Sequence, residues 1–223
     1  MKTVGVILSS EEARNAGLVI GSLGRGSQDE WSDLDLLIFT KGSTLIENLP
    51  EWTTRFGRVL RVGEAPPQNA PQGGRQLTVW YDIGTTMPLL VDWNVWPLVF
   101  AAQPHDTRLW FNRTDQPLGD PDATFDAYAS SLPRVDTPIR EHSPEELRRY
   151  RFSMVPVAAK YIARRDAHRT TLAFALIGLP VTSDDPHDQV AVLRELFENV
   201  SLGESEEVTT AVRRMLRFVV DRR

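Results

Sequence analysis

The chain has 223 residues, of which 41% are hydrophobic and 25% are charged, and its formal net charge is −5. This length and balance are typical of a globular protein with one large or two small domains, and the acidic charge argues against a protein that coats DNA or RNA. The absence of cysteine excludes disulfides, thiolate zinc sites and a cysteine nucleophile.

The first residues, MKTVGVILSSEEARN, lack the basic start and long apolar core of a signal peptide. No stretch of the chain reaches the roughly 18 apolar residues that a membrane span needs. We therefore expect a cytoplasmic protein without a membrane partner.

The predicted elements of the first half are mostly short strands and loops. Residues 3–8 are expected to form a short strand or lead into a helix, and SSEEARN after them carries a helix-start signal of Ser followed by Glu. Further along we predict strands at 17–22, 33–39, 58–63, 75–82 and 87–97, a helix at 44–57, a hairpin turn at 83–86, and loops at 23–32, 41–43 and 64–74. The pattern predicts a mixed or antiparallel sheet with few helices.

The composition changes after about residue 100. Residues 101–140 are polar and proline-rich with weak periodicity, and are expected to link two parts of the protein. A helix is predicted from Ser143 to residue 166, followed by a buried apolar segment at 171–179 and amphipathic helices at 188–200 and 206–223. The sequence thus predicts an α+β fold: a domain at 1–140, with a mixed sheet, flanking helices and a linker from about 101, and a helical bundle at 141–223.

Two aspartates stand where a buried strand is predicted to begin, in the stretch GSLGRGSQDEWSDLDLLIF (21–39). Asp is disfavoured in strands because its side chain hydrogen-bonds the backbone and favours turns. Asp33 and Asp35 are two residues apart, so they project from the same face, with Cβ atoms about 6–7 Å apart. Their charges repel, and a divalent cation between them removes that penalty. Mg²⁺ prefers a few carboxylate oxygens together with water and phosphate oxygens, so the pair predicts a metal site for a nucleoside triphosphate.

Other residues support a phosphate site. Gly21 allows the backbone to approach a ligand, Ser22 offers a hydroxyl and an N–H to phosphate oxygens, and Arg25 supplies a planar donor fork. Asp92, within LLVDWNVW, is a second acid among apolar residues on a predicted strand, and is expected to join the same cluster. Asp82, near the end of another strand, is the alternative third carboxylate.

The order Gly-Ser, Arg-Gly, five residues and Ser-Asp-Leu-Asp resembles the nucleotidyltransferase signature of the DNA polymerase β superfamily, in particular the bacterial antibiotic and minimal nucleotidyltransferases. The resemblance implies a nucleotidyltransferase-type sheet in which Gly21 and Ser22 hold the β- and γ-phosphates. It also implies two Mg²⁺ ions bound by Asp33, Asp35 and a third acid, Asp92, which acts either as a ligand or as the base.

The resemblance reaches the second half of the chain at AAKYIARRD (158–166), which is similar to a helix of aminoglycoside adenylyltransferases. It implies that Lys160 faces the triphosphate. Three acids, Glu141, Glu145 and Glu146, are alternative bases, although acids are in any case favoured in the first turn of a helix. The four histidines show no ligand spacing and are expected to be surface or structural residues.

These residues predict an adenylyltransferase-like enzyme. It would transfer a nucleoside monophosphate, with ATP the favoured donor, to a hydroxyl of a small molecule such as an aminoglycoside-type antibiotic, releasing pyrophosphate and conferring antibiotic resistance. One alternative is a protein or tRNA acceptor, as in toxin–antitoxin nucleotidyltransferases, because RRYR, ARRD and RRMLR are basic runs. Another alternative is a nucleotide-binding module without catalysis.

Overall fold

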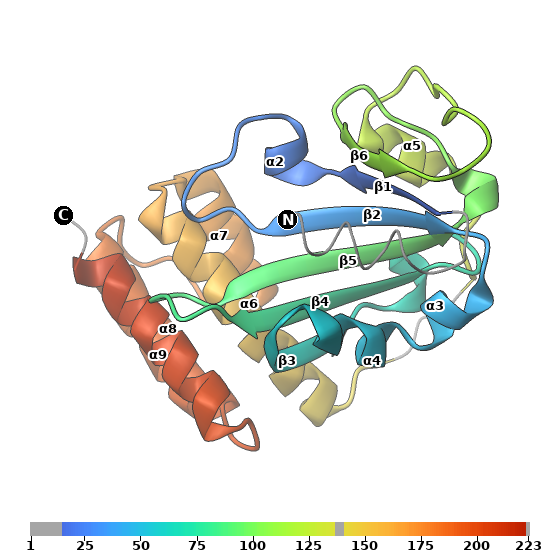
Figure 1. Ribbon diagram of the computed structural model, residues 1–223. Coiled ribbons are helices and arrows are strands. Elements are labelled where there is room, and N and C mark those ends of the chain that lie inside the picture. The colour runs from blue at the N-terminus through green and yellow to red at the C-terminus, as the bar shows by residue number, and fades with distance from the viewer. Residues whose placement is uncertain (1–14, 137–140, 222–223) are drawn as a thin grey trace. The chain divides into compact units, whose positions relative to one another are not determined.

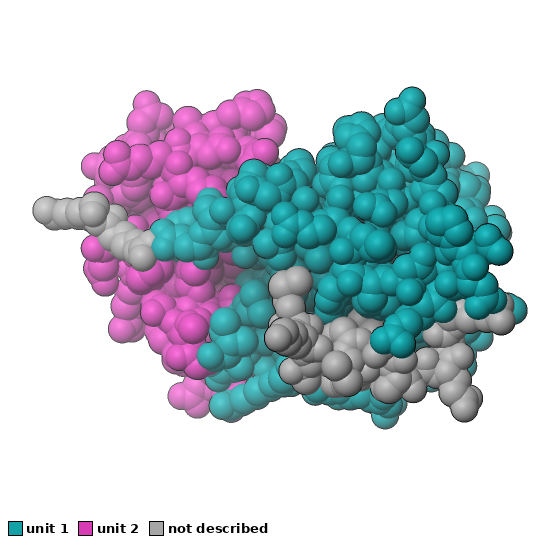
Figure 2. All heavy atoms as spheres, turned by 45° about the horizontal axis from the view of Figure 1, so that its top comes forward, with its two compact units in different colours: residues 1–83, 89–138 teal, residues 84–88, 139–223 magenta. Residues whose placement is uncertain are grey.

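The computed structural model describes residues 15–136 and 141–221, so the predictions for residues 3–8 and for SSEEAR lie outside the described residues. The chain divides into two compact units (Figure 2). Unit 1 comprises Met1–Ile83 and Leu89–Pro138, and unit 2 comprises Gly84–Pro88 and Ile139–Arg223. Among the described residues, the strands belong to unit 1 and the long helices to unit 2.

Unit 1 is built on a mixed sheet of six strands in the order β3-β4-β5-β2-β1-β6 (Figure 1). The strands are β1 (Asn15–Val19), β2 (Leu34–Thr40), β3 (Arg58–Glu64), β4 (Arg75–Asp82), β5 (Leu89–Pro97) and β6 (Arg108–Asn112). Strands β2 and β5 are parallel, and the other neighbouring pairs are antiparallel. The predicted α+β class and mixed sheet are confirmed.

The two faces of the sheet pack against different apolar clusters. On β2, Leu36 and Ile38 belong to the cluster that contains residues of the short helices α3 (Ser43–Glu47) and α4 (Leu49–Thr53). The alternate residues Leu37 and Phe39 belong to the cluster on the opposite face. Successive strand residues point to opposite faces, and full burial of each such side chain contributes about 1.5–3 kcal/mol. Strand β2 is therefore apolar on both faces beyond its first two residues, and Asp35 near its start is the exception.

The single helix predicted at 44–57 is wrong. The segment forms α3, then α4 beginning at Leu49, then a 3-10 turn at Thr54–Phe56. Pro50 explains the break, because proline has no N–H to donate and clashes with the preceding turn, whereas it is tolerated in the first turn of a new helix.

The strand predicted at 17–22 is also shorter than expected. It ends at Val19, and Gly21–Gly24 form a single turn of helix, α2. The change of direction occurs at Gly21, whose φ is +64°. This left-handed conformation ends the strand and is readily adopted only by glycine.

Residues 101–136, expected to act as a linker, carry two elements of unit 1. Strand β6 pairs with β1 at the edge of the sheet, and helix α5 (Phe125–Ser131) packs against the apolar cluster that contains Leu37 and Phe39. The Phe125 ring stacks on Trp96 with centroids 5.6 Å apart. A five-residue strand and a seven-residue helix are too short to produce a clear periodicity, which is why the sequence pattern did not reveal them.

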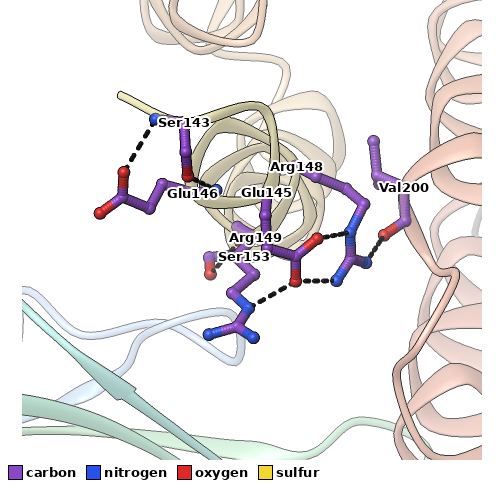
Figure 3. Close-up of polar contacts among 7 residues, drawn as sticks. All are labelled: Ser143, Glu145, Glu146, Arg148, Arg149, Ser153 and Val200. Atoms are coloured by element: carbon purple, nitrogen blue, oxygen red, sulfur yellow. Dashed lines mark hydrogen bonds and ion pairs between the residues drawn. The ribbon is translucent and has the colours of Figure 1, made fainter. Parts of the chain in front are cut away.

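Unit 2 consists of helices α6 (Pro144–Ala163), α7 (Ala167–Leu176), α8 (Pro186–Val200) and α9 (Glu206–Asp221), with α6 in contact with the other three. The predicted start of α6 is confirmed by a capping box (Figure 3). The Ser143 hydroxyl accepts the Glu146 N–H at 3.2 Å, and the Glu146 carboxylate accepts the Ser143 N–H at 2.8 Å. This exchange satisfies two helix-start groups at once.

The segment 171–179 is only partly buried, contrary to expectation. Its buried residues include Phe174 and Ile177, while Leu172 is 51% exposed and Leu176 is 59% exposed. The buried positions have the spacing of one face of a helix. Leu172 and Leu176 lie on other faces, where they are exposed. No helix within residues 15–136 and 141–221 has the length and apolar character needed to cross a membrane.

Candidate active site

Two of the predicted carboxylates lie side by side on the sheet. Asp35 of β2 and Asp92 of β5 are register partners on adjacent parallel strands. Such partners project from the same face, and neighbouring strands are about 4.8 Å apart. Thr78 of β4 is in turn the register partner of Asp92. We call Thr78, Asp92 and Asp35, all half-buried, the carboxylate row.

Gly21 lies directly against this row. The Ile20 N–H donates to the Asp35 carbonyl oxygen at 3.0 Å, and the chain turns into α2 at the next residue. A Cβ placed on Gly21 would lie only 2.8 Å from Cγ of Asp35. The left-handed backbone favours glycine, and any side chain here would require the Asp35 carboxylate to move. The structure thus brings Gly21 and Asp35 together, while the predicted contact of Gly21 with a phosphate stays a prediction.

Thr78 contacts the acid beside it. Its Oγ1 donates a hydrogen bond to Asp92 Oδ1 at 2.5 Å. Sequence reasoning missed this residue, because a threonine within RQLTVWYD is an ordinary strand residue. Only the register of β4 against β5 reveals its contact with Asp92.

Asp33 lies one residue before β2 and is half-buried. Within residues 15–136 and 141–221, no three Asp, Glu or His side chains gather as they would around a metal ion. The Asp35 and Asp92 pair could still hold Mg²⁺, because this ion is commonly bound by one or two carboxylates and completed by water and substrate phosphates. The role of Asp33 as a third ligand stays a prediction.

The alternative third carboxylate, Asp82, is engaged elsewhere. It lies at the end of β4, four residues beyond Thr78, which is about 13 Å along a strand. Its carboxylate is 3.5 Å from the Arg58 guanidinium on β3. Of the two candidates, Asp92 is therefore the one that adjoins Asp35.

The loop after Gly21 carries the predicted phosphate ligands. The Ser22 carbonyl oxygen accepts the Ser27 N–H at 2.9 Å, which folds the loop back onto α2. Arg25 is exposed, and its guanidinium is 3.9 Å from the Asp106 carboxylate. The other oxygen of Asp106 accepts the Phe125 N–H at the start of α5, at 2.6 Å. A phosphate that binds Arg25 would share it with Asp106, and this role stays a prediction.

A second arginine near the loop was missed from the sequence. Arg108 of β6 is the register partner of Val19, and its Nη2 lies 3.8 Å from the position that a Cβ on Gly26 would occupy. No signal pointed to it, because β6 itself was not predicted.

The predicted residues of the second half belong to unit 2. Lys160 lies on α6 and is 6% exposed. Its proximity to a triphosphate stays a prediction, as does a catalytic role for Glu141. Glu145 is held by the guanidinium groups of Arg148 and Arg149, at 2.7 and 2.8 Å (Figure 3).

These bonds, with that from Arg148 the stronger, lower the pKa of Glu145 to about 2. A carboxylate with so low a pKa is a weak proton acceptor near neutral pH. Glu146 is occupied in the capping box. Neither acid is therefore suited to act as the base.

Comparison with known proteins adds little. No family model matches the chain, and no curated protein matches it. Among solved structures, an aminoglycoside 6-adenyltransferase from Bacillus subtilis aligns over 98% of this chain and 96% of its own, with 9% sequence identity and a TM-score of 0.31. A TM-score this low does not establish a common fold, so the proposals below depend on the residues of this chain alone.

Proposed function

We propose that the chain is a Mg²⁺-dependent nucleotidyltransferase that transfers a nucleoside monophosphate, most readily AMP from ATP, to a hydroxyl of a small molecule such as an aminoglycoside-type antibiotic. The observation that carries the proposal is the pairing of Asp35 and Asp92 in register, with Gly21 against Asp35. Like charges directly opposite each other repel, and a cation bound between them would relieve that repulsion.

The residues divide the work between binding and proton transfer. Asp35 and Asp92, with Asp33 the predicted third ligand, would hold Mg²⁺, and the backbone of Gly21 and the hydroxyl of Ser22 would hold the β- and γ-phosphates. When bound, the metal supplies charge neutralisation on the phosphates and activation of the attacking oxygen.

The reaction is an in-line displacement. The acceptor oxygen forms a bond to the α-phosphorus, the bond from the α-phosphorus to the bridging oxygen breaks, and pyrophosphate leaves with that electron pair. With Asp92 holding the metal, the acceptor's proton passes to water; in the alternative in which Asp92 is the base and not a ligand, its carboxylate takes that proton. Most of the rate enhancement in such transfers comes from positioning and charge neutralisation.

Pyrophosphate release tests the proposal. Each of the four NTPs is incubated with Mg²⁺ and a mixed panel of aminoglycosides and other hydroxylated antibiotics, with wild type beside Asp35→Asn. Release that requires one panel member and disappears in the variant supports the proposal and identifies donor and acceptor together. Binding of NTP with no release for any panel member would instead indicate another acceptor or a binding module without catalysis.

A second acceptor class, tRNA, is favoured by one feature of unit 2. Helices α8 and α9 border a groove of about 370 Å³. Its lining residues are Arg194, Phe197, Glu198, Arg213, Leu216 and Arg217. Three arginines against one acid give the groove a positive charge, which favours a phosphate backbone.

Transfer of label from an [α-³²P]NTP to total tRNA tests this alternative. Arg217→Gln should weaken labelling. Arg113→Gln, which changes an exposed arginine outside both the groove and the three basic runs, should leave it unchanged. An absence of labelled tRNA for the wild type excludes the alternative.

A further inference from the structure

We infer that Thr78 is the positioning residue that fixes the Asp92 carboxylate for metal binding. The inference depends on the proposed function, because it assigns Thr78 a role at the same Mg²⁺ site. It rests on the hydrogen bond from Thr78 Oγ1 to Asp92 Oδ1 and on the register that places Thr78, Asp92 and Asp35 in one row.

The geometry gives Thr78 control over one carboxylate only. Asp92 has Thr78 on one side and Asp35 on the other, since β5 lies between β4 and β2. Asp35 is confined differently, by the close approach of Gly21. The two acids are therefore held from opposite ends of the carboxylate row.

The chemistry explains why a hydroxyl suits this position. A carboxylate on a short side chain can rotate about its last bond, and a donor on one oxygen fixes the plane of the group. The hydroxyl also stabilises the negative charge that a cation requires. Hydrogen bonds to the ligands of a metal typically change its affinity by about 10-fold to 100-fold when they are removed.

Stability alone does not call for this bond. Thr78 is half-buried, and a β-branched apolar residue would fill the same position on the strand equally well. Thr78→Val is thus close in shape and should fold, and it removes only the donor. Thr78→Ser restores the donor and serves as the rescue variant.

The inference is tested by measuring the binding of Mn²⁺ in place of Mg²⁺. The EPR signal of free Mn²⁺ is recorded in the presence of a non-hydrolysable ATP analogue. We expect Thr78→Val to raise the dissociation constant for Mn²⁺ about 10-fold, and Thr78→Ser to remain close to wild type. With turnover, the apparent KM for Mg²⁺ should rise while kcat at saturating Mg²⁺ changes much less.

Thr53→Val is the control, because it likewise removes a hydroxyl donor, here one that is buried and donates to the Pro50 carbonyl oxygen at 2.7 Å. It should alter stability without altering Mn²⁺ affinity. Equal Mn²⁺ affinity in wild type and Thr78→Val would overturn the inference and leave the proposed function standing. A wild type that binds no Mn²⁺ with the nucleotide analogue would overturn both. If Thr78→Val unfolds, Thr78→Ala takes its place in the same comparison.

Discussion

One pair of charged residues in unit 1 is arranged in the opposite way from the ion pairs of unit 2. In unit 2, opposite charges pair along or between helices, as Glu145 does with Arg148 and Arg149, and Arg213 with Glu198. In unit 1, the like charges of Asp35 and Asp92 occupy facing positions on adjacent strands. The first arrangement is explained by helix stability, whereas the second works against the stability of the sheet. The difference supports the proposed assignment of the chemistry to unit 1.

The largest effect is expected from Asp35→Asn, which directly tests whether the facing acids serve function. Pyrophosphate release should fall by about 1000-fold or more, because the metal loses a ligand and the phosphates lose charge neutralisation. Stability to urea should stay the same or rise by up to about 1 kcal/mol, because one of two facing charges is removed.

Asp82→Asn is the control for this comparison. The Asp82 carboxylate lies 3.5 Å from the Arg58 guanidinium, and Asp82 is not part of the carboxylate row. Its rate should match wild type. A strongly destabilised Asp35→Asn would show instead that the acid is structural.

Gly21→Ala sharpens the same comparison from the backbone side. The methyl group would overlap the Asp35 carboxylate, and the φ of +64° is unfavourable for alanine. We expect a loss of about 2–4 kcal/mol in the free energy of unfolding, together with loss of activity. Urea unfolding and pyrophosphate release measure the two effects.

Gly84→Ala is a matched control at a φ of +73° with nothing within 4 Å of the new methyl group. It should cost only the backbone term, about 1–2 kcal/mol. Equal costs at the two glycines would mean that the contact with Asp35 contributes nothing.

Tyr81 predicts how unit 1 responds to alkaline pH. Burial raises its pKa from 10.0 to about 12, although its hydroxyl donates to the Thr53 carbonyl oxygen at 2.8 Å. The folded state disfavours the phenolate. The contribution of the neutral Tyr81 to the free energy of unfolding is therefore complete below pH 10 and is lost as the pH rises from about 10 towards 12.

Tyr81→Phe should therefore flatten the decline of stability over that range, as measured by urea unfolding at successive pH values. The ultraviolet absorbance of phenolate gives a second readout. A titration of Tyr81 in the folded protein near pH 10 would contradict the prediction.

The smallest effect is expected in unit 2, at Glu145. Its pKa is lowered from 4.5 to about 2 by Arg148 first and Arg149 second. The contribution of the ionised Glu145 to the free energy of unfolding is thus complete above pH 4.5 and is lost as the pH falls from there towards 2. Glu145→Gln should slightly reduce stability at neutral pH and weaken its dependence on acid.

The side-chain carboxyl signal of Glu145, followed by NMR, gives the titration directly. Salt should reduce the effect because the group is exposed. A midpoint close to 4.5 would show that the ion pairs do not persist in solution.

Local patterns in the sequence determined much of the protein. Alternation and turn residues located β2, β4 and β5 to within about two residues at their ends, and Ser143 marked the start of α6. The misplaced acids Asp35 and Asp92 were recognisable because an aspartate among buried strand residues conflicts with local preference. Such features depend on near neighbours in the chain, which a sequence displays directly.

Only the tertiary structure decided which residues meet. The parallel register of β2 and β5 pairs Asp35 with Asp92, and that of β4 brings in Thr78 and leaves Asp82 with Arg58. Strand β6 forms the edge of the sheet by pairing with β1. Register depends on contacts between segments that are distant in the chain, and a shift of one residue would turn every side chain to the other face. Gly21, Asp35 and Asp92 were therefore visible in the sequence, whereas strand pairing decided that Asp35 and Asp92 meet and that Thr78 joins them.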